Sequence, residues 1–148
     1  ADNADNTLSV DPSAYQYLND TQTLDITYTY DVTDSIGGSV AQSATITITG
    51  TDDVPVVTGA LVGSADDTDG VLTVDLLSGA SEADTGDTLT ITGLTSSGDT
   101  SGITLNTDNT LSVDPTAYAS LPAGATEVIT YSYDIIQIKT KTRPATAR

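Results

Sequence analysis

Closely spaced carboxylates are the side chains of this sequence that could do chemistry. Asp52 and Asp53 are adjacent in GTDDVP, and Glu82, Asp84 and Asp87 follow within SEADTGDTL. Calcium takes roughly six to eight oxygen ligands, mostly carboxylates and carbonyls, and it tolerates irregular geometry. Loops with acids at this spacing can supply such oxygens, so both segments are candidates for calcium binding. The alternative is that these residues are solvated turn acids, because Asp is favoured in turns for its own hydrogen bonds.

The charge of the chain favours bound cations. The formal net charge is −17, from 21 acidic and four basic residues, and all four basic residues lie after position 138. A compact structure with this charge repels itself, and bound divalent cations would offset the repulsion. The same charge argues against nucleic acid as a partner, because phosphate binding uses Lys and Arg to displace counterions. A surface that is simply solvated is the alternative interpretation.

Other kinds of chemistry lack their usual side chains. The sequence contains no His and no Cys, which removes the commonest general bases, nucleophiles and zinc ligands. It has no Trp and few other aromatic residues to hold a sugar ring for glycoside hydrolysis by paired carboxylates. No apolar run approaches the roughly 18 residues of a membrane span. The sequence therefore predicts neither an enzyme nor membrane insertion.

An internal repeat provides the framework that must position these acids. The segment that begins at Asp5 recurs at Asp108, 103 positions later, and ten of its first eleven residues are identical. The match continues without a gap to Asp134, where the second copy departs from the first. Two copies of one structural unit are therefore expected.

The repeat predicts the domain organisation. Residues 1–55 are expected to be the C-terminal part of one β-sandwich repeat plus a linker, and residues 56–148 a second repeat. The last residues, 135–148, form an atypical basic tail, and the sequence leaves open whether this tail is native. The second repeat would then lack its final strand, which would expose a sheet edge. Residues 1–50 could supply that strand, within the chain or between chains.

The apolar pattern predicts an all-β fold. Leu24, Ile26, Tyr28, Tyr30 and Val32 alternate with Thr and Asp, which is the period-two signature of a half-buried strand. The same alternation marks residues 44–48, 72–76, 89–91 and 129–135. Turn clusters rich in Gly, Asp and Ser separate these segments. Short strands at this spacing are typical of an Ig-like antiparallel β-sandwich.

Four segments of the chain carry a family resemblance. They are YTYDVTD (28–34), ATITITGTDDVP (44–55), GDTLTITGL (86–94) and TLSVDPTAY (110–118). Together they resemble the VCBS and cadherin-like repeats of bacterial RTX-type adhesins and large secreted repeat proteins. The resemblance implies cadherin-like β-sandwich repeats, calcium within or between them, and a place outside the cell, secreted or on its surface. It implies neighbouring repeats of the same protein as partners.

The resemblance extends to the acidic loops. GTDDVP is similar to a cadherin-type linker in which an Asn-Asp pair precedes a Pro, with Asp52 standing where Asn is usual. SEADTGDTL resembles the family's acidic loop, although Glu82 replaces an Asp and Ala83 replaces a Pro. Asp34 ends its strand and would lie near the junction in such a sandwich. The candidate calcium ligands are therefore Asp53, Glu82, Asp84, Asp34, Asp52 and Asp87.

Two functional interpretations follow. The first is a non-catalytic, calcium-stabilised structural or adhesive module. The alternative is a carbohydrate- or protein-binding module, accessory to a polysaccharide-degrading enzyme or acting alone, that recognises a surface glycan or another cadherin-like domain through exposed tyrosines. Tyr15 and Tyr118 recur in both copies and are expected in the core, on single helical turns at 12–18 and 115–121. Tyr17 does not recur and suits the surface.

Overall fold

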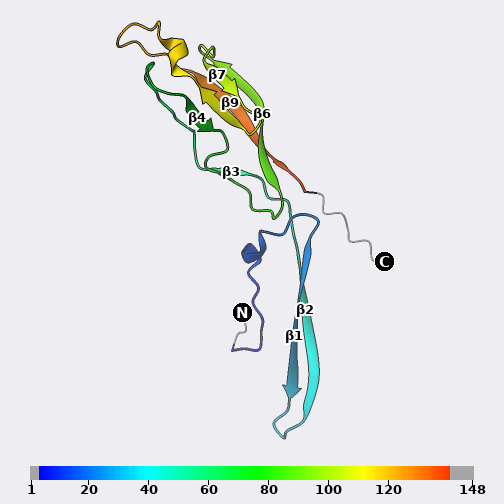
Figure 1. The fold of residues 1–148 in the computed structure, drawn as a ribbon. Helices are drawn as coiled ribbons and strands as arrows, with labels where there is room; N and C mark the ends of the chain where they lie inside the picture. The colour runs from blue at the N-terminus through cyan, green and yellow to red at the C-terminus, as the bar shows by residue number, and fades with distance from the viewer. Residues whose placement is uncertain (1–3, 141–148) are drawn as a thin grey trace. The chain divides into compact units, whose positions relative to one another are not determined.

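The computed structural model describes residues 4–140, which form β-strands and two short 3₁₀ turns but no α-helix (Figure 1). The described residues accordingly include no helix with the length and apolarity needed to cross a bilayer. The predicted all-β, antiparallel fold is confirmed. The contacts of the chain divide it into two units. Unit 1 comprises Ala1–Asp53 with Ala83–Thr85, and unit 2 comprises Val54–Glu82 with Gly86–Arg148.

Unit 1 is built on a long hairpin. Strand β1 (Thr23–Thr33) pairs antiparallel with β2 (Ser39–Thr49) along its whole length. Because side chains alternate along each strand, one face of the hairpin carries mainly Thr, Ser and Asp and the other carries mainly Leu, Ile, Tyr and Val. On the polar face the Thr47 hydroxyl donates a hydrogen bond to the Asp25 carboxylate across the two strands, at 2.5 Å. The predicted alternation is therefore present in the structure.

The duplicated segments form the same local turns. Both η1 (Pro12–Tyr15) and η2 (Pro115–Tyr118) are 3₁₀ turns with a proline at their start. The carboxylates of Asp11 and Asp114 cap these turns, each accepting a hydrogen bond from the backbone N–H two residues later. The helical turns predicted around Tyr15 and Tyr118 are confirmed, and both tyrosines are half-buried.

Unit 2 contains the sheets of a sandwich. One sheet has three strands in the order β4 (Leu72–Asp75), β8 (Thr110–Val113) and β7 (Ile103–Leu105). A second sheet pairs β6 (Thr88–Ser97) with β9 (Thr130–Ile138). The short strands β3 (Val56–Val57) and β5 (Ala80–Ser81) pair with each other. Every pair of strands is antiparallel.

The core of unit 2 lies where the two larger sheets meet. Leu76, which follows β4, and Leu111 in β8 are buried. The Tyr133 hydroxyl of β9 donates a hydrogen bond to the Leu76 carbonyl at 2.9 Å, which ties one sheet to the other. The Asn109 side-chain oxygen, just before β8, accepts a hydrogen bond from Ile91 N in β6 at 3.3 Å. The inward-facing residues of β9, Tyr131, Tyr133 and Ile135 among them, are half-buried.

The end of the second repeat differs from the prediction. Residues 135–138, which begin the predicted tail, belong to β9, because they pair with residues 88–91 of β6. Residues 141–148 of that tail lie outside the described residues. Within residues 4–140, β9 pairs only with β6 and β1 pairs only with β2. Residues 1–50 thus keep both of their strands in unit 1 instead of completing a sheet of unit 2.

Alkaline pH is expected to destabilise unit 2. Burial raises the pKa of Tyr131 and of Tyr133, with smaller contributions from the nearby Tyr118 and Asp75 respectively. In the unfolded chain tyrosine ionises near pH 10, so above about pH 10 the unfolded state has released protons that the folded state still holds. Stability is therefore fully present below about pH 10 and falls as the pH rises through the folded pKa values. Urea denaturation at about pH 8 and pH 11, with tyrosinate absorbance as a second signal, measures this effect; equal midpoints would contradict it.

Candidate metal site

Asp84 is the most buried acid in the described part of the chain, with 3% of its surface exposed. One of its oxygens, Oδ2, accepts a hydrogen bond from the backbone N–H of Asp53 at 3.0 Å. The next residue, Thr85, donates its backbone N–H to the Tyr17 carbonyl at 3.0 Å. These two bonds hold residues 83–85 within unit 1. A carboxylate so deeply buried is costly unless hydrogen bonds and positive charge compensate it.

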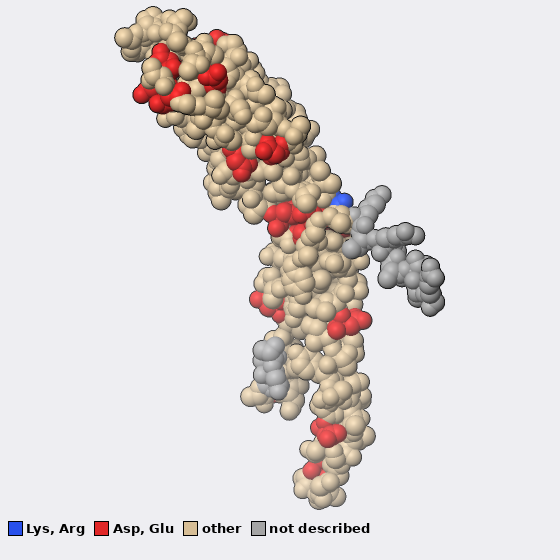
Figure 2. Space-filling view, viewed as in Figure 1, with Lys and Arg blue, Asp and Glu red and all other residues tan. Residues whose placement is uncertain are grey.

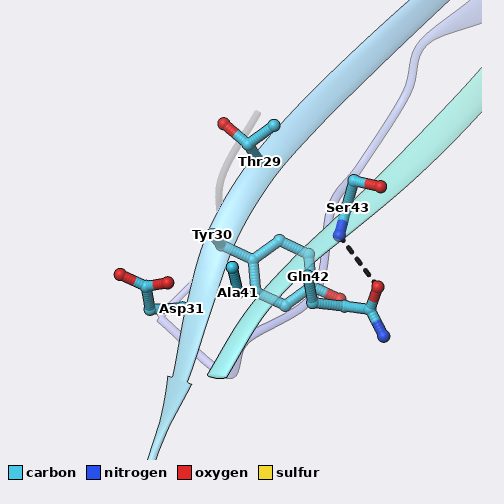
Figure 3. Close-up of a pocket in the computed structure, with 6 residues that line it drawn as sticks. All are labelled: Thr29, Tyr30, Asp31, Ala41, Gln42 and Ser43. Carbon is cyan, nitrogen blue, oxygen red and sulfur yellow. Dashed lines mark hydrogen bonds between the residues drawn. The ribbon is translucent and has the colours of Figure 1, made fainter. Parts of the chain in front are cut away.

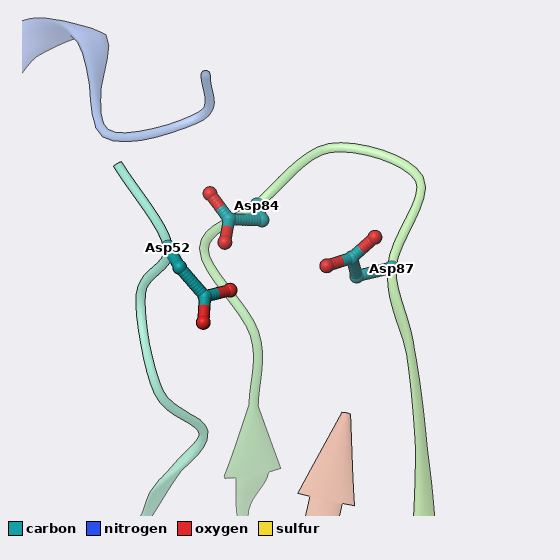
Figure 4. A group of neighbouring side chains, drawn as sticks. All are labelled: Asp52, Asp84 and Asp87. Atoms are coloured by element: carbon teal, nitrogen blue, oxygen red, sulfur yellow. The ribbon is translucent and has the colours of Figure 1, made fainter. Parts of the chain in front are cut away.

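Three carboxylates are brought close together. One oxygen from each of Asp52, Asp84 and Asp87 lies within 4.8 Å of the other two, as Figure 4 shows. Asp52 is exposed, Asp84 is buried, and Asp87 is half-buried and lies three residues further along the same loop. At such separations each pair of like charges costs on the order of 1 kcal/mol in water and a few kcal/mol near a protein surface. The group therefore favours a bound cation.

Asp87 adds a second indication of a cation. Its Oδ1 accepts a hydrogen bond from Thr140 N at 3.0 Å, and the Thr140 hydroxyl donates to the Gly86 carbonyl. Its Oδ2 is buried and accepts no hydrogen bond from the residues that the structure describes. A buried carboxylate oxygen without a donor costs the desolvation of a charge, which a metal ion would recover. No sequence pattern pointed to Thr140, which lies 53 residues beyond Asp87 and reaches it only through the fold.

The donor set suits a hard divalent cation. Three carboxylates supply only oxygen, and the absence of His and Cys from the chain leaves no nitrogen or thiolate ligand for zinc. Calcium accepts carboxylates at irregular geometry from flexible loops, whereas magnesium requires near-octahedral geometry. The residues present therefore fit calcium, with backbone carbonyls and water available for the remaining positions.

The other predicted ligands are placed differently. Asp53 is half-buried and its backbone N–H holds Asp84, but its carboxylate is not part of the group of three. Glu82 precedes the group in the same loop and is half-buried, with one oxygen inaccessible to solvent, and it too lies outside the group. The acidic loop predicted from SEADTGDTL thus contributes Asp84 and Asp87.

Asp34 does not lie near the junction, and that expectation was wrong. It follows β1 at the tip of the hairpin, and its carboxylate accepts hydrogen bonds from Ile36 N at 2.9 Å and Gly38 N at 2.7 Å. The paired strands separate this tip from Gly50 by eleven residue pairs, on the order of 30 Å at the rise of a β-strand. The carboxylate therefore closes a turn, which is a common role of Asp.

Acidic side chains are also spread over the surfaces of both units, away from this group (Figure 2). Lys139 is the one Lys or Arg among residues 4–140. The excess of negative charge predicted from composition is therefore present over the described surface. Screening by salt weakens repulsion between exposed acids, but it acts less on a buried one such as Asp84.

Comparison with known proteins identifies a family. The family model described as a cadherin-like domain matches residues 51–147. No curated protein and no solved structure matches the chain. The match covers unit 2 and includes all three carboxylates of the group. With its all-β antiparallel fold and this match over most of its length, the chain belongs to the family of cadherin-like domains.

Proposed function

We propose that the chain is a non-catalytic, calcium-stabilised structural or adhesive module of a secreted or cell-surface bacterial protein. Membership of the cadherin-like family supports the structural or adhesive role. The sequence resemblance to VCBS repeats of RTX-type adhesins supports the bacterial and extracellular setting. The single observation that carries the calcium part is the group of Asp52, Asp84 and Asp87, with Asp84 almost entirely buried.

The proposed ion would be held mainly by Asp52 and Asp84. These residues are far apart in sequence, because Asp52 follows β2 and Asp84 lies in the loop after β5. An ion bound by both would therefore cross-link two segments of unit 1. The backbone N–H of Asp53 orients Asp84 by occupying its Oδ2. Asp87 supplies a further carboxylate from the same loop. When bound, calcium supplies the positive charge that offsets their mutual repulsion.

Neighbouring repeats of the same protein are the proposed partners. A structural module between neighbouring repeats would hold the loops that join successive sandwiches in one conformation. GTDDVP suits this role, because Pro55 restricts the backbone on the way from Asp53 to β3. Ordering of this segment by calcium would limit its bending.

Calcium is expected to raise the melting temperature of the chain. For a site with a Kd of about 1 mM, which is typical of extracellular modules, about 10 mM calcium adds roughly 1.4 kcal/mol to stability. For units of this size that corresponds to an increase on the order of 5–10 °C. The measurement is a calorimetric melt of the full chain in calcium and in chelator. A melt unchanged by calcium would remove the calcium part of the proposal.

Ionic strength is the matched control for this experiment. Salt alone screens repulsion among the 21 acids and stabilises a highly charged chain without any site. Sodium chloride at equal ionic strength should therefore give a smaller shift than calcium. Equal shifts from the two salts would indicate general screening and contradict a specific site.

A further inference from the structure

The basic residue of the described chain lies beside one of the candidate metal ligands. Lys139 is the one Lys or Arg among residues 4–140. It directly follows β9, whereas Asp87 directly precedes β6, and these two strands pair with each other. Both residues belong to unit 2. The antiparallel pairing therefore brings an ammonium group and a carboxylate to the same end of one sheet.

The register of this sheet sets the two residues opposite each other. Thr88 at the start of β6 pairs with Ile138 at the end of β9, so the next residues outward are Asp87 and Lys139. The two segments stay adjacent there, because Thr140 N donates a hydrogen bond to Asp87 Oδ1 at 3.0 Å. The Cα of Lys139 is one peptide unit before that nitrogen. It therefore lies on the order of 5 Å from the Asp87 carboxylate.

The alternation of side chains assigns both residues to the same face of the sheet. The half-buried positions of β9 run in steps of two as far as Gln137, and Lys139 is two residues further on. On the partner strand, Leu89 pairs with Gln137 and is half-buried, and Asp87 lies two residues before it. Lys139 itself is exposed. Its ammonium group can therefore move without disturbing the core.

A positive charge at this position acts on a metal ion as well as on the carboxylate. Asp87 Oδ2 is buried and accepts no hydrogen bond from the residues that the structure describes. In the metal-free chain the ammonium group of Lys139, on its flexible four-carbon stem, offsets part of this negative charge. A calcium ion bound by Asp87 is a like charge for the same ammonium group and repels it. The two cations therefore oppose each other at this carboxylate.

We propose that Lys139 competes with calcium for Asp87 and thereby lowers the calcium affinity of the candidate metal site. The ammonium group acts as the counter-ion of Asp87 until calcium displaces it. This inference rests on the proposed function, because competition requires that Asp87 helps to bind the ion. It adds to that proposal the identity of a residue that sets the affinity.

The expected effect is moderate, because the charge of Lys139 is exposed to solvent. Removal of the charge is expected to lower the Kd for calcium by about three- to tenfold at low ionic strength. Salt screens interactions between exposed charges. The difference between the variant and the parent chain should therefore shrink in about 0.5 M sodium chloride.

The test compares the full parent chain with Lys139→Gln, which removes the charge, and Lys139→Arg, which keeps it. Equilibrium dialysis with radioactive calcium measures the Kd of each chain. Lys139→Gln should bind calcium about three- to tenfold more tightly, and Lys139→Arg within about twofold of the parent. In chelator, Lys139→Gln should melt a few degrees lower than the parent, because its acids have lost a counter-ion. At saturating calcium this deficit should disappear.

Gln42→Glu is the matched control, because it too makes the net charge more negative by one. Gln42 lies on the hairpin of unit 1 beside its cross-strand partner Tyr30, and its side-chain oxygen accepts a hydrogen bond from Ser43 N at 3.0 Å (Figure 3). Glutamate retains that oxygen. Gln42 precedes Gly50 by eight residues of extended chain, on the order of 25 Å and beyond the screening length of physiological salt. This variant should bind calcium with unchanged Kd.

Each alternative outcome has a distinct meaning. Equal or weaker calcium binding by Lys139→Gln, with binding by the parent intact, would overturn this inference and leave the proposed function standing. The same tightening in Gln42→Glu would also overturn it, because net charge alone would then explain the result. Absence of calcium binding in the parent and in every variant would remove the proposed function together with the competition.

Discussion

Replacing Gly50 by alanine is expected to unfold unit 1 while unit 2 stays folded. A Cβ atom at this position would lie 2.1 Å from the Asn19 carbonyl oxygen and 2.5 Å from that of Leu18. Both contacts are with backbone of buried residues, which cannot move away as a flexible side chain would. Gly50 N also donates to the Gln22 carbonyl at 2.9 Å, so a shift would break this bond.

The cost is expected at the upper end of the ~1–3 kcal/mol typical of overpacking. Unit 1 has little stability to lose, because a hairpin of two strands with a partly exposed apolar face is marginal by itself. Hydrogen exchange resolved by segment should show loss of protection in β1 and β2, with β6 and β9 unchanged. Gly70→Ala is the matched control, since no atom lies within 4 Å of the added methyl group. If the amides of β1 stay protected in the Gly50→Ala variant, the prediction is wrong and the backbone at residues 18–19 can move to accommodate the added methyl group.

Replacing Asp84 by asparagine is expected to abolish most of the stabilisation by calcium. Asparagine keeps the shape of the side chain and an oxygen that can accept the hydrogen bond from Asp53 N, so the change removes mainly charge. Calcium affinity depends on the number of charged ligands, and we expect the Kd to rise by roughly tenfold or more. A calcium titration followed by the melting temperature measures this loss.

The same variant also distinguishes a metal-binding role of Asp84 from a purely structural one, because the two roles predict opposite changes in stability in chelator. In chelator, Asp84→Asn removes one of three neighbouring negative charges, so stability should be equal to or greater than that of the parent chain. In calcium it should be lower. A loss of the same size in both conditions would mean that the carboxylate stabilises the fold without a metal ion. Asp66→Asn, in an exposed turn of unit 2, should change neither melt by more than about 0.5 kcal/mol.

The strands could be predicted from residue order because their signal is local. Polar and apolar residues alternate through β1, through residues 44–49 of β2 and through residues 130–135 of β9, and a period of two has one structural solution when one face is buried. Alternation did not predict the short strands β3, β5 and β7, nor the end of β9 at Ile138, which lies beyond the departure from the repeat at 135. Residues 135–138 continue β9 because they pair with residues 88–91 of β6, a long-range contact that comparison with the first copy could not reveal.

The metal ligands could be predicted only in part. The acids of GTDDVP and SEADTGDTL were candidates from their spacing, and the structure groups Asp52, Asp84 and Asp87. Spacing could not distinguish Asp53, which contributes its backbone N–H, from its neighbour Asp52, because adjacent acids lie at nearly the same separation along the chain from Asp84 and Asp87. Nor could it exclude Asp34, whose separation from the group depends on the length and pairing of the hairpin.

Residue order alone determined the features that short-range contacts decide. The capped 3₁₀ turns and the left-handed backbone of Asn6 and Asn109, each with a φ of 62°, recur in both copies of the repeat. Tertiary structure alone decided burial and the grouping of charges. Leu8 and Leu111 have the same neighbours in sequence, yet only Leu111 is covered, because the strands that exclude water from it come from distant parts of the chain. Hydrophobic burial and carboxylate proximity are properties of such long-range contacts, which no local pattern contains.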